Sequence, residues 1–209
     1  MKFFSAAILA TSVFFTFSTW ADTNYNPGTY QIDPAHSKVG FEIPHLVISS
    51  VDGRFQTFEG KVTLDAKFEK SKVNATVEMS SIDTGNPKRD DHLRSPDFFD
   101  VAKFKQMKFE SKSIVGTPQD FKMTGTLTMK GVTKPVSFDG KYLGTVNDGY
   151  GNEKAVFTAE ATIKRSDFGL TWNKMVEAGP VVGDSLKIQL RIQAAHPAPA
   201  KAAGAKPAK

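Results

Sequence analysis

The side chains best suited to acid–base chemistry in this 209-residue chain are three histidines, His36, His45 and His92. A hydrolase needs a nucleophile and a base in mutual reach, but His36-Ser37 is not a hydrolase motif and no Gly-x-Ser-x-Gly sequence occurs. The chain has no cysteine, and the spacing of the histidines matches no common zinc pattern. We therefore expect hydrogen-bonded structural or rim histidines, with no catalytic residue, metal or cofactor. An enzyme that acts on a small exported substrate through these histidines is the alternative.

The densest polar cluster is Arg89-Asp90-Asp91-His92-Leu93-Arg94. Its two arginines could hold a phosphate group bidentately, as guanidinium groups do. The same charges could equally pair with one another on a solvated, capped turn of helix. The sequence leaves these two interpretations open.

The formal charge of +5, from 27 Lys and Arg against 22 Asp and Glu, is concentrated at the two ends of the chain. Lys2, Lys201, Lys206 and Lys209 lie outside residues 22–195, which hold 23 basic and 22 acidic residues. A body that is nearly neutral, with interleaved signs, gives no reason to expect nucleic-acid binding.

Residues 1–21 have the composition of a secretory signal peptide, with Lys2, a mostly apolar stretch at 3–17, and small residues at Thr19 and Ala21. The apolar stretch is shorter than the roughly 20 residues of a spanning helix, and no later stretch approaches that length, so we expect no transmembrane segment. We expect a periplasmic protein with a folded body at residues 22–195. Residues 196–209, rich in Ala, Pro and Lys, predict a disordered tail.

Apolar and polar residues alternate along most of the body, which is typical of strands with one buried face. Six segments show the pattern clearly: 61–68, 73–79, 121–129, 136–142, 157–163 and 186–192. Segments around Tyr30, 39–43 and 107–114 raise the expected number to about eight or nine strands. Short connections favour antiparallel neighbours, and the single apolar face favours an all-β closed barrel or sandwich in water. A membrane barrel is disfavoured, because the polar faces are dense in Lys, Glu and Asp.

Two segments interrupt the alternation. Residues 84–101 contain Asn86-Pro87 and Ser95-Pro96, each a capping residue before a proline suited to the first helical position. We therefore expect a short helical insertion near residues 86–101. Residues 165–184, which include Trp172 and Met175, predict a long loop of the kind that lines or covers a site.

Five segments, in order along the chain, carry a resemblance to a known family: residues 30–46, 53–60, 81–100, 125–136 and 165–170. The specific central motif is Ser81-Ile-Asp-Thr-Gly-Asn-Pro-Lys-Arg-Asp-Asp-His-Leu-Arg-Ser-Pro-Asp-Phe-Phe-Asp100. Together the segments resemble the YceI-like family across the whole body. One departure is Lys105, where family members commonly carry Pro, and it affects a strand entrance more than a pocket. The resemblance implies a periplasmic, lipocalin-like barrel that binds a long isoprenoid chain, such as a polyprenyl phosphate or a quinone tail.

The expected ligand-binding site is the barrel interior and its rim. Small inward residues leave volume that larger side chains would fill, namely Gly125, Ala66, Ala75, Ala159, Ala161 and Gly140. Such residues also fit a tapering barrel, so a filled barrel that acts as an interaction module stays an alternative. The expected binding residues are Phe41, His45, Val47, Phe55, Phe58, Arg89, His92, Leu93, Arg94, Phe98, Phe99, Leu127, Trp172 and Met175. Arg89 and Arg94 would meet a lipid head group, and an exposed strand edge could support a homodimer.

Overall fold

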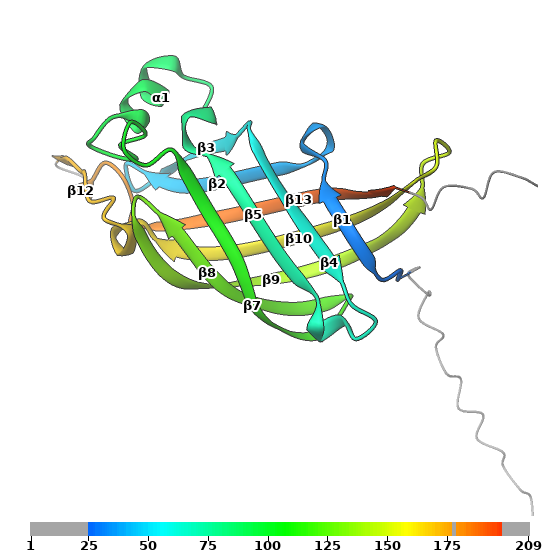
Figure 1. Ribbon diagram of the computed structural model, residues 1–209. Helices are drawn as coiled ribbons and strands as arrows, with labels where there is room; N and C mark the ends of the chain where they lie inside the picture. Colours follow the sequence, from blue (N-terminus) through cyan, green and yellow to red (C-terminus); the bar gives the residue numbers. More distant parts are fainter. Residues whose placement is uncertain (1–24, 177–178, 198–209) are drawn as a thin grey trace, which may run out of the picture.

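The computed structural model describes residues 25–176 and 179–197, which form a closed antiparallel β-barrel of eight strands (Figure 1). In pairing order the barrel strands are β1 (Gly28–Ile32), β4 (Phe58–Leu64), β5 (Lys72–Glu78), β7 (Gln106–Thr117), β8 (Asp120–Met129), β9 (Val132–Asn147), β10 (Asn152–Lys164) and β13 (Ser185–Pro197). The barrel closes where Gln31 and Ile32 of β1 pair with Ala195 and Ala194 of β13. The all-β barrel expected from the alternation is confirmed.

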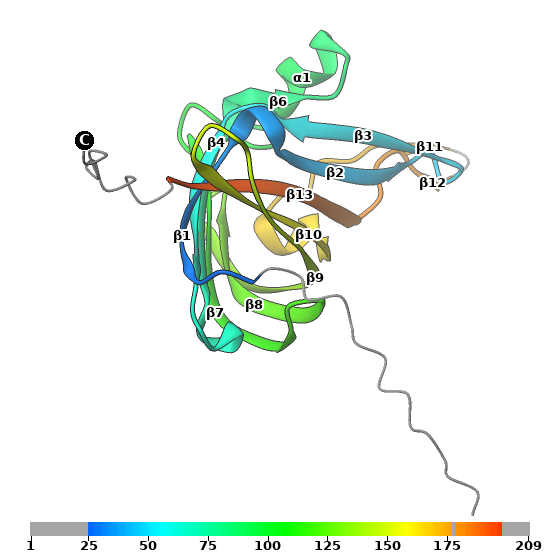
Figure 2. The same cartoon turned by 90° about the vertical axis from the view of Figure 1, so that its right-hand side faces the viewer.

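Three further strands extend the sheet at one end of the barrel (Figure 2). They are β2 (Lys38–His45), β3 (Ser49–Phe55) and β6 (Ile82–Asp83). A 3₁₀ turn, η1 (Pro34–His36), separates β1 from β2, so that both pair with β13, β2 at residues 187–191 and β1 nearer the C-terminus. The alternation did not predict β3, because its one inward face carries only Val51, Gly53 and Phe55, of which Phe55 alone is buried. We call this part of the molecule the wide end.

The period of two in the sequence determines which side chains enter the barrel. Along β8, Phe121, Met123, Leu127 and Met129 are buried, and most of the residues between them are more exposed. Burial of this apolar face is what drives closure of the sheet. One inward assignment was wrong: β4 ends at Leu64, and Ala66 is exposed in the turn that follows.

Two of the small inward residues make room for aromatic rings of the protein itself. A Cβ atom on Gly125 would lie 2.4 Å from Cζ of Phe109, and one on Gly140 would lie 2.4 Å from Cζ of Phe121. These rings occupy the space that the glycines leave. Open volume in the barrel therefore depends on other positions, such as Ala75 and Ala159.

The helical insertion is a single helix, α1 (Pro87–Arg94), which packs against β6 at the wide end. The Asn86 side chain caps it by accepting a hydrogen bond of 3.2 Å from the amide of Arg89. The second helix start, at Ser95-Pro96, was wrong, because Ser95 is the C-cap of α1 and its carbonyl accepts the amides of Phe98 and Asp100 in tight turns. Among the described residues no helix is long and apolar enough to cross a membrane.

Residues 165–184 also lie at the wide end. They begin with a 3₁₀ turn, η4 (Arg165–Phe168), and include a small hairpin of β11 (Met175–Val176) and β12 (Gly179–Pro180). An isolated bridge joins His45, the last residue of β2, to Val182. The expected long loop is therefore partly ordered by pairing with β2.

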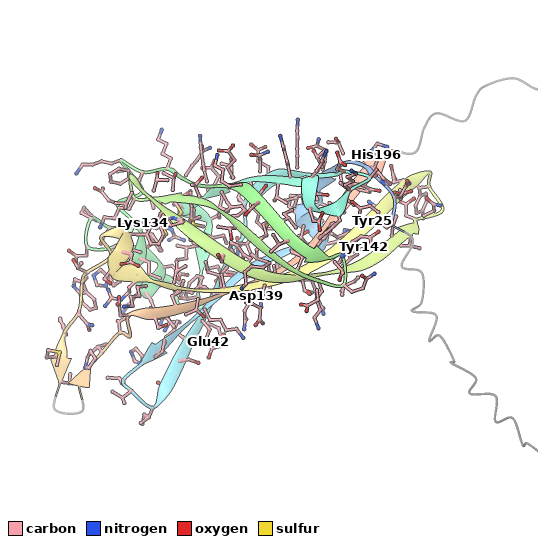
Figure 3. All side chains as sticks on the ribbon, turned by 90° about the horizontal axis from the view of Figure 1, so that it is seen from below. Tyr25, Glu42, Lys134, Asp139, Tyr142 and His196 are labelled. Atoms are coloured by element: carbon pink, nitrogen blue, oxygen red, sulfur yellow. The ribbon has the colours of Figure 1, made fainter. Side chains whose placement is uncertain are left out.

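The opposite end of the barrel is closed by aromatic residues (Figure 3). Tyr25 and Tyr142 have ring centroids 5.7 Å apart, and the ring of His196 lies 5.4 Å from that of Tyr30. Tyr30 is fully buried and donates a 2.9 Å hydrogen bond to the carbonyl of Asn26.

The remaining 3₁₀ turns are η2 (Phe68–Lys70) and η3 (Met79–Ser81). β13 continues to Pro197, while the expected signal peptide and the tail from residue 198 lie outside the described residues.

Candidate functional site

The barrel interior contains an apolar cavity of about 130 Å³, which we call the lumen. Its lining includes Phe58, Leu127 and Ala159, and all the lining residues except Ser71 and Thr158 have apolar side chains. An apolar cavity of this size stays dry and is able to take up a small hydrocarbon. The lumen is therefore suited to an apolar ligand and to little else.

A smaller cavity of about 60 Å³, the neck, lies between the lumen and the wide end. Residues that it shares with the lumen include Val39 and Leu127. Phe41, Phe99 and Leu186 line both the neck and a third cavity at the wide end. Because neighbouring cavities share wall residues, the three cavities lie one after another along the barrel, and we call this series the apolar path.

The third cavity, the mouth, has a volume of about 400 Å³. Three segments that are far apart in the sequence provide most of its lining: the end of β2, helix α1 with the turns after it, and residues 165–186. Val51 of β3 and Ile82 of β6 complete it. Its apolar wall includes Phe98, which is buried, and Trp172, which is half-buried. The mouth is thus the place where the apolar path meets polar side chains.

The polar lining of the mouth is cationic. It consists of His45, Asn86, Lys88, Arg89, His92 and Arg165, and no Asp or Glu is among the lining residues. Arg89 is fixed by hydrogen bonds of 2.7 Å to Oγ1 and 2.8 Å to the carbonyl of Thr84. Lys88 is exposed and free to turn toward a ligand. This arrangement favours an anionic or strongly accepting group at the mouth.

His92 is held by aromatic neighbours and by one carboxylate. Its ring lies edge-on to Phe98 at 5.0 Å and to Trp172 at 4.9 Å between centroids. Its Nε2 lies 3.0 Å from Oδ2 of Asp97. His92 therefore closes one wall of the mouth and keeps a polar edge toward solvent.

Arg165 is a buried cation between the neck and the mouth, with 6% of its surface exposed. Its guanidinium donates to main-chain carbonyls, with Nε to Gly183 at 2.8 Å and Nη1 to Trp172 at 2.9 Å and to Leu170. Burial lowers the pKa of this guanidinium, and the charge of Asp184 opposes that effect. A buried arginine with carbonyl acceptors keeps its positive charge close to the cavity.

The structure places the expected binding residues in three groups. Phe58 and Leu127 line the lumen, and Leu127, Phe41, Phe55 and Phe99 line the neck. Phe41, His45, Arg89, His92, Leu93, Phe98, Phe99 and Trp172 line the mouth. The remaining three, Val47, Arg94 and Met175, line none of these cavities.

Those three residues have other surroundings. Arg94 donates 2.9 Å hydrogen bonds to the carbonyls of Ser80 and Ile82 and pairs with Asp91, so it fastens α1 to the barrel. Val47 and Met175 are exposed on two neighbouring hairpins at the wide end. The polar cluster at residues 89–94 is therefore divided, since Arg89 faces the mouth and Arg94 has local partners.

Sequence reasoning missed Arg165, Lys88 and Leu186 at the mouth, and Met107 and Met123 in the lumen. The two methionines had a signal, because they lie on the apolar faces of predicted strands. Arg165 had two weak signals, its place in a segment of the family resemblance and its place at the start of the long loop 165–184. Nothing in its neighbours indicated that the side chain is buried.

The three histidines do not form one site. His36 lies on η1 and pairs with Asp33 at 2.9 Å, whereas His45 and His92 line the mouth. His45 Nδ1 lies 3.5 Å from Oγ of Ser49. In residues 25–176 and 179–197, no group of three or more His, Asp or Glu side chains is placed to hold a metal ion.

Comparison with known proteins gives a family for this architecture. The YceI-like domain family matches residues 30–194. The chain is 42% identical over 158 residues to a protein of Serratia proteamaculans named UPF0312 protein, covering 74% of this chain and 80% of that protein. It is 43% identical over 145 residues to Protein YceI of Salmonella newport, covering 68% of this chain and 76% of that protein.

Solved structures share the fold. The chain superposes on BcnA of Burkholderia cenocepacia with a TM-score of 0.67 at 25% identity, covering 78% of this chain and 98% of that one. The YCEI protein of Campylobacter jejuni gives a TM-score of 0.63 at 34% identity, covering 78% and 95%. A domain of Saccharophagus degradans, described as polyisoprenoid binding, gives 0.59 at 15% identity, covering 83% and 100%, and this likeness shows the fold alone.

Proposed function

The chain belongs to the family of YceI-like domains, and we propose that it binds a long-chain isoprenoid lipid in its lumen, as a carrier or a scavenger and not as an enzyme. The ligand class is a polyprenyl phosphate or an isoprenoid quinone. The Saccharophagus degradans domain bears the description polyisoprenoid binding. That description applies to a remote neighbour and supports the ligand class only through the shared fold.

The observation that carries the proposal is the apolar path from the lumen through the neck to a cationic mouth. Each methylene-sized unit of an isoprenoid chain contributes about 0.8 kcal/mol when it is removed from water. A polar head group has no partners in the lumen, because nearly all of its lining is apolar. The chain would therefore lie inside and the head group at the mouth.

The volume of the lumen limits how much of the chain enters without adjustment. A cavity of about 130 Å³ accommodates a short hydrocarbon segment, so a longer chain has to displace lining side chains. Met107 and Met123 line the lumen, and unbranched thioether side chains adapt to new shapes more easily than branched ones. We expect these methionines to change rotamer when a long chain binds.

The mouth provides the partners for a head group. Lys88, Arg89 and Arg165 bring positive charge to its lining, and the lining has no carboxylate. A phosphate would gain charge-assisted hydrogen bonds here, and a quinone carbonyl would gain weaker ones. Binding of the lipid in this way needs no cofactor and no metal ion.

One observation favours an enzyme as the second candidate: the His92–Asp97 pair beside the mouth resembles a base with its orienting carboxylate. The side chains of Phe98 and Trp172 that flank His92 are apolar and provide no nucleophile. The two candidates make different predictions for His92→Phe. This substitution would abolish hydrolysis of a prenyl phosphate, whereas binding of the chain would persist.

The proposed site of action is the periplasm, which rests on the signal-like residues 1–21 of the sequence. A lipid that moves through this compartment has to be shielded from water, which is what the barrel interior offers. The homodimer expected from an exposed strand edge stays a prediction.

Trp172 gives a direct test of binding, because it is the sole tryptophan after residue 21 and it lines the mouth. Titration of the purified protein with farnesol and with farnesyl phosphate should change Trp172 fluorescence to saturation. The phosphate should bind more tightly at low salt. Absence of any saturable change with either compound would contradict the proposed function.

A further inference from the structure

The wide end carries an exposed apolar tip made of the turn of one hairpin and the first strand of another. Leu46, Val47 and Ile48 form the turn between β2 and β3, and Met175 and Val176 form β11. Val47, Ile48 and Met175 are 63%, 93% and 76% exposed. We call these five residues the tip.

The β2–β3 hairpin lies beside the segment that contains β12, and the two are hydrogen-bonded to each other. The amide of Leu46 donates a 2.9 Å hydrogen bond to the carbonyl of Val181, and the amide of Gly183 donates one of 2.8 Å to the carbonyl of Pro44. A Cβ atom on Gly179 would lie 3.4 Å from Cγ2 of Val47. The tip is therefore one surface rather than two separate loops.

The turn keeps apolar side chains where the backbone disfavours them. Leu46 and Val47 have φ angles of 51° and 68°, in the left-handed region that Gly and Asn adopt easily and a β-branched residue adopts rarely. Leu-Val-Ile is unfavourable in such a turn for two reasons. The backbone is strained, and apolar side chains are exposed to water. Unfavourable choices of this kind in an exposed turn point to a binding role.

The position of the tip identifies what it binds. His45, Val181 and Val182 line the mouth and are adjacent to tip residues, so whatever covers the tip also covers the entrance to the lumen. A long isoprenoid chain is poorly soluble in water and resides in a bilayer before it enters a carrier. We infer that the tip inserts into the surface of an anionic phospholipid bilayer and brings the mouth against it, an inference that rests on the proposed function.

The charges around the tip fit such a surface. The described residues 43–51, 168–176 and 179–183 include no Asp or Glu, and the sequence has one acidic residue, Glu177, between β11 and β12. Three cations outnumber it, since Lys174 borders the tip and Lys88 and Arg89 line the mouth. Cations beside an apolar wedge strengthen attachment to anionic lipids. Glu42 and Asp52 pair across β2 and β3, about four residues or 13 Å behind Ile48, and mark where insertion would stop.

The opposite end of the barrel provides a matched control. Tyr150, in the turn between β9 and β10, is 93% exposed, as Ile48 is. Asn152 at the start of β10 pairs with Pro197, whereas Lys164 at its end pairs with Ser185. Tyr150 and the tip therefore lie at opposite ends of the barrel.

The first experiment is flotation of the full chain with vesicles of phosphatidylcholine and phosphatidylglycerol. The variant Leu46→Asn, Val47→Gly and Ile48→Ser puts residues that tolerate a left-handed turn in place of the apolar ones, so it should fold and bind vesicles about tenfold more weakly. Tyr150→Ser should bind as the native chain does. Equal binding by the tip variant and the native chain would overturn the inference.

The second experiment reports orientation. In a Trp172→Phe background, Ile48→Trp should show a blue-shifted emission and quenching by vesicles with brominated acyl chains, and Tyr150→Trp should show neither. Quenching at both positions or at Tyr150→Trp alone would overturn the inference. A dimer that depends on the tip residues and does not bind vesicles would also overturn the inference, because the tip would then contact a second copy of the chain.

Binding of farnesol in the absence of vesicles separates this inference from the proposed function. If the native chain and the tip variant bind farnesol equally and only the native chain floats with vesicles, both hold. If farnesol binds but the tip variant still floats, only the inference about the tip fails. If farnesol does not bind at all, the proposed function fails.

Discussion

Arg165 donates a 2.9 Å hydrogen bond from Nη1 to the main-chain carbonyl of Trp172 and thereby fastens the indole that walls the mouth to the end of β10. The same guanidinium holds the carbonyls of Leu170 and Gly183. Because these carbonyls belong to different parts of residues 165–184, one buried side chain organises the whole segment. The mouth thus depends on an arginine whose role is to position backbone and to bring charge to the cavity.

Replacement of this arginine should destabilise the protein. Arg165→Ala leaves the buried carbonyl of Leu170 and the partly buried carbonyls of Trp172 and Gly183 without this donor, so we expect the free energy of unfolding to fall by about 2–4 kcal/mol. Urea unfolding followed by circular dichroism measures this. Arg54→Ala is the matched control, because Arg54 forms an exposed ion pair with Asp83 and should lose at most about 1 kcal/mol. Similar losses for the two variants would contradict the structural role of Arg165.

Filling the lumen should block ligand binding without unfolding the barrel. Ala159 is buried and lines the lumen, so Ala159→Phe places a ring where the isoprenoid chain would lie. We expect the affinity for farnesol to fall by about tenfold or more. Thr162→Phe on the same strand is the control, because Thr162 is exposed and its side chain points outward. Unchanged farnesol binding by a folded Ala159→Phe variant would place the ligand elsewhere.

Substitution of Lys88 should change the affinity for a ligand with a charged head group and leave the affinity for a neutral one unchanged. It is exposed and lines the mouth, so Lys88→Gln should weaken farnesyl phosphate binding about twofold to fivefold, in the range of an exposed ion pair. Farnesol binding should not change. Lys122→Gln, which removes an exposed cation paired with Asp139 on the outer face, is the control and should alter neither affinity. Equal weakening for both ligands in Lys88→Gln would argue against a head group at the mouth.

Low pH should destabilise the packing of residues 165–184, which line part of the mouth. Hydrogen bonds from the hydroxyl and the amide of Ser166 lower the pKa of Asp184 below its ordinary value of 3.8. Because the folded-state pKa is depressed, the carboxylate stabilises the native state above its unfolded pKa, and this contribution is lost as the pH falls through the folded value. Asp184→Asn should therefore be less stable than the native chain at pH 7, with the gap closing below about pH 4. A gap that stays constant with pH would contradict this role.

The barrel was predictable because the side of the sheet on which a side chain lies depends only on its position along the strand. Along β10 the sequence alternates so regularly that burial of Ala159 and Ala161 follows from their neighbours. The mouth was not predictable in this way, since Phe41, His92 and Trp172 meet only after three distant segments have packed. Their aromatic and polar character suggested a rim, but their contacts depend on long-range register.

Two local signals were misleading for physical reasons. Ser95-Pro96 has the form of a helix start, yet the carbonyl of Ser95 is already used by the amides of Phe98 and Asp100, which turns the chain toward the mouth. Gly125 and Gly140 suggested space for a ligand, but aromatic rings of neighbouring strands occupy that space. In both cases a tertiary contact competed with the local preference and prevailed.

Extraction of the purified protein tests the central claim most directly. The full chain, produced in an exporting bacterial host that makes isoprenoid lipids, should yield about one isoprenoid lipid per protein molecule on organic extraction and mass spectrometry, because the lumen and the neck together are small enough for one chain. Ala159→Phe prepared in the same way should yield little, and Thr162→Phe as much as the native chain. Recovery of no isoprenoid from the native chain, or of equal amounts from native and Ala159→Phe protein, would contradict the account.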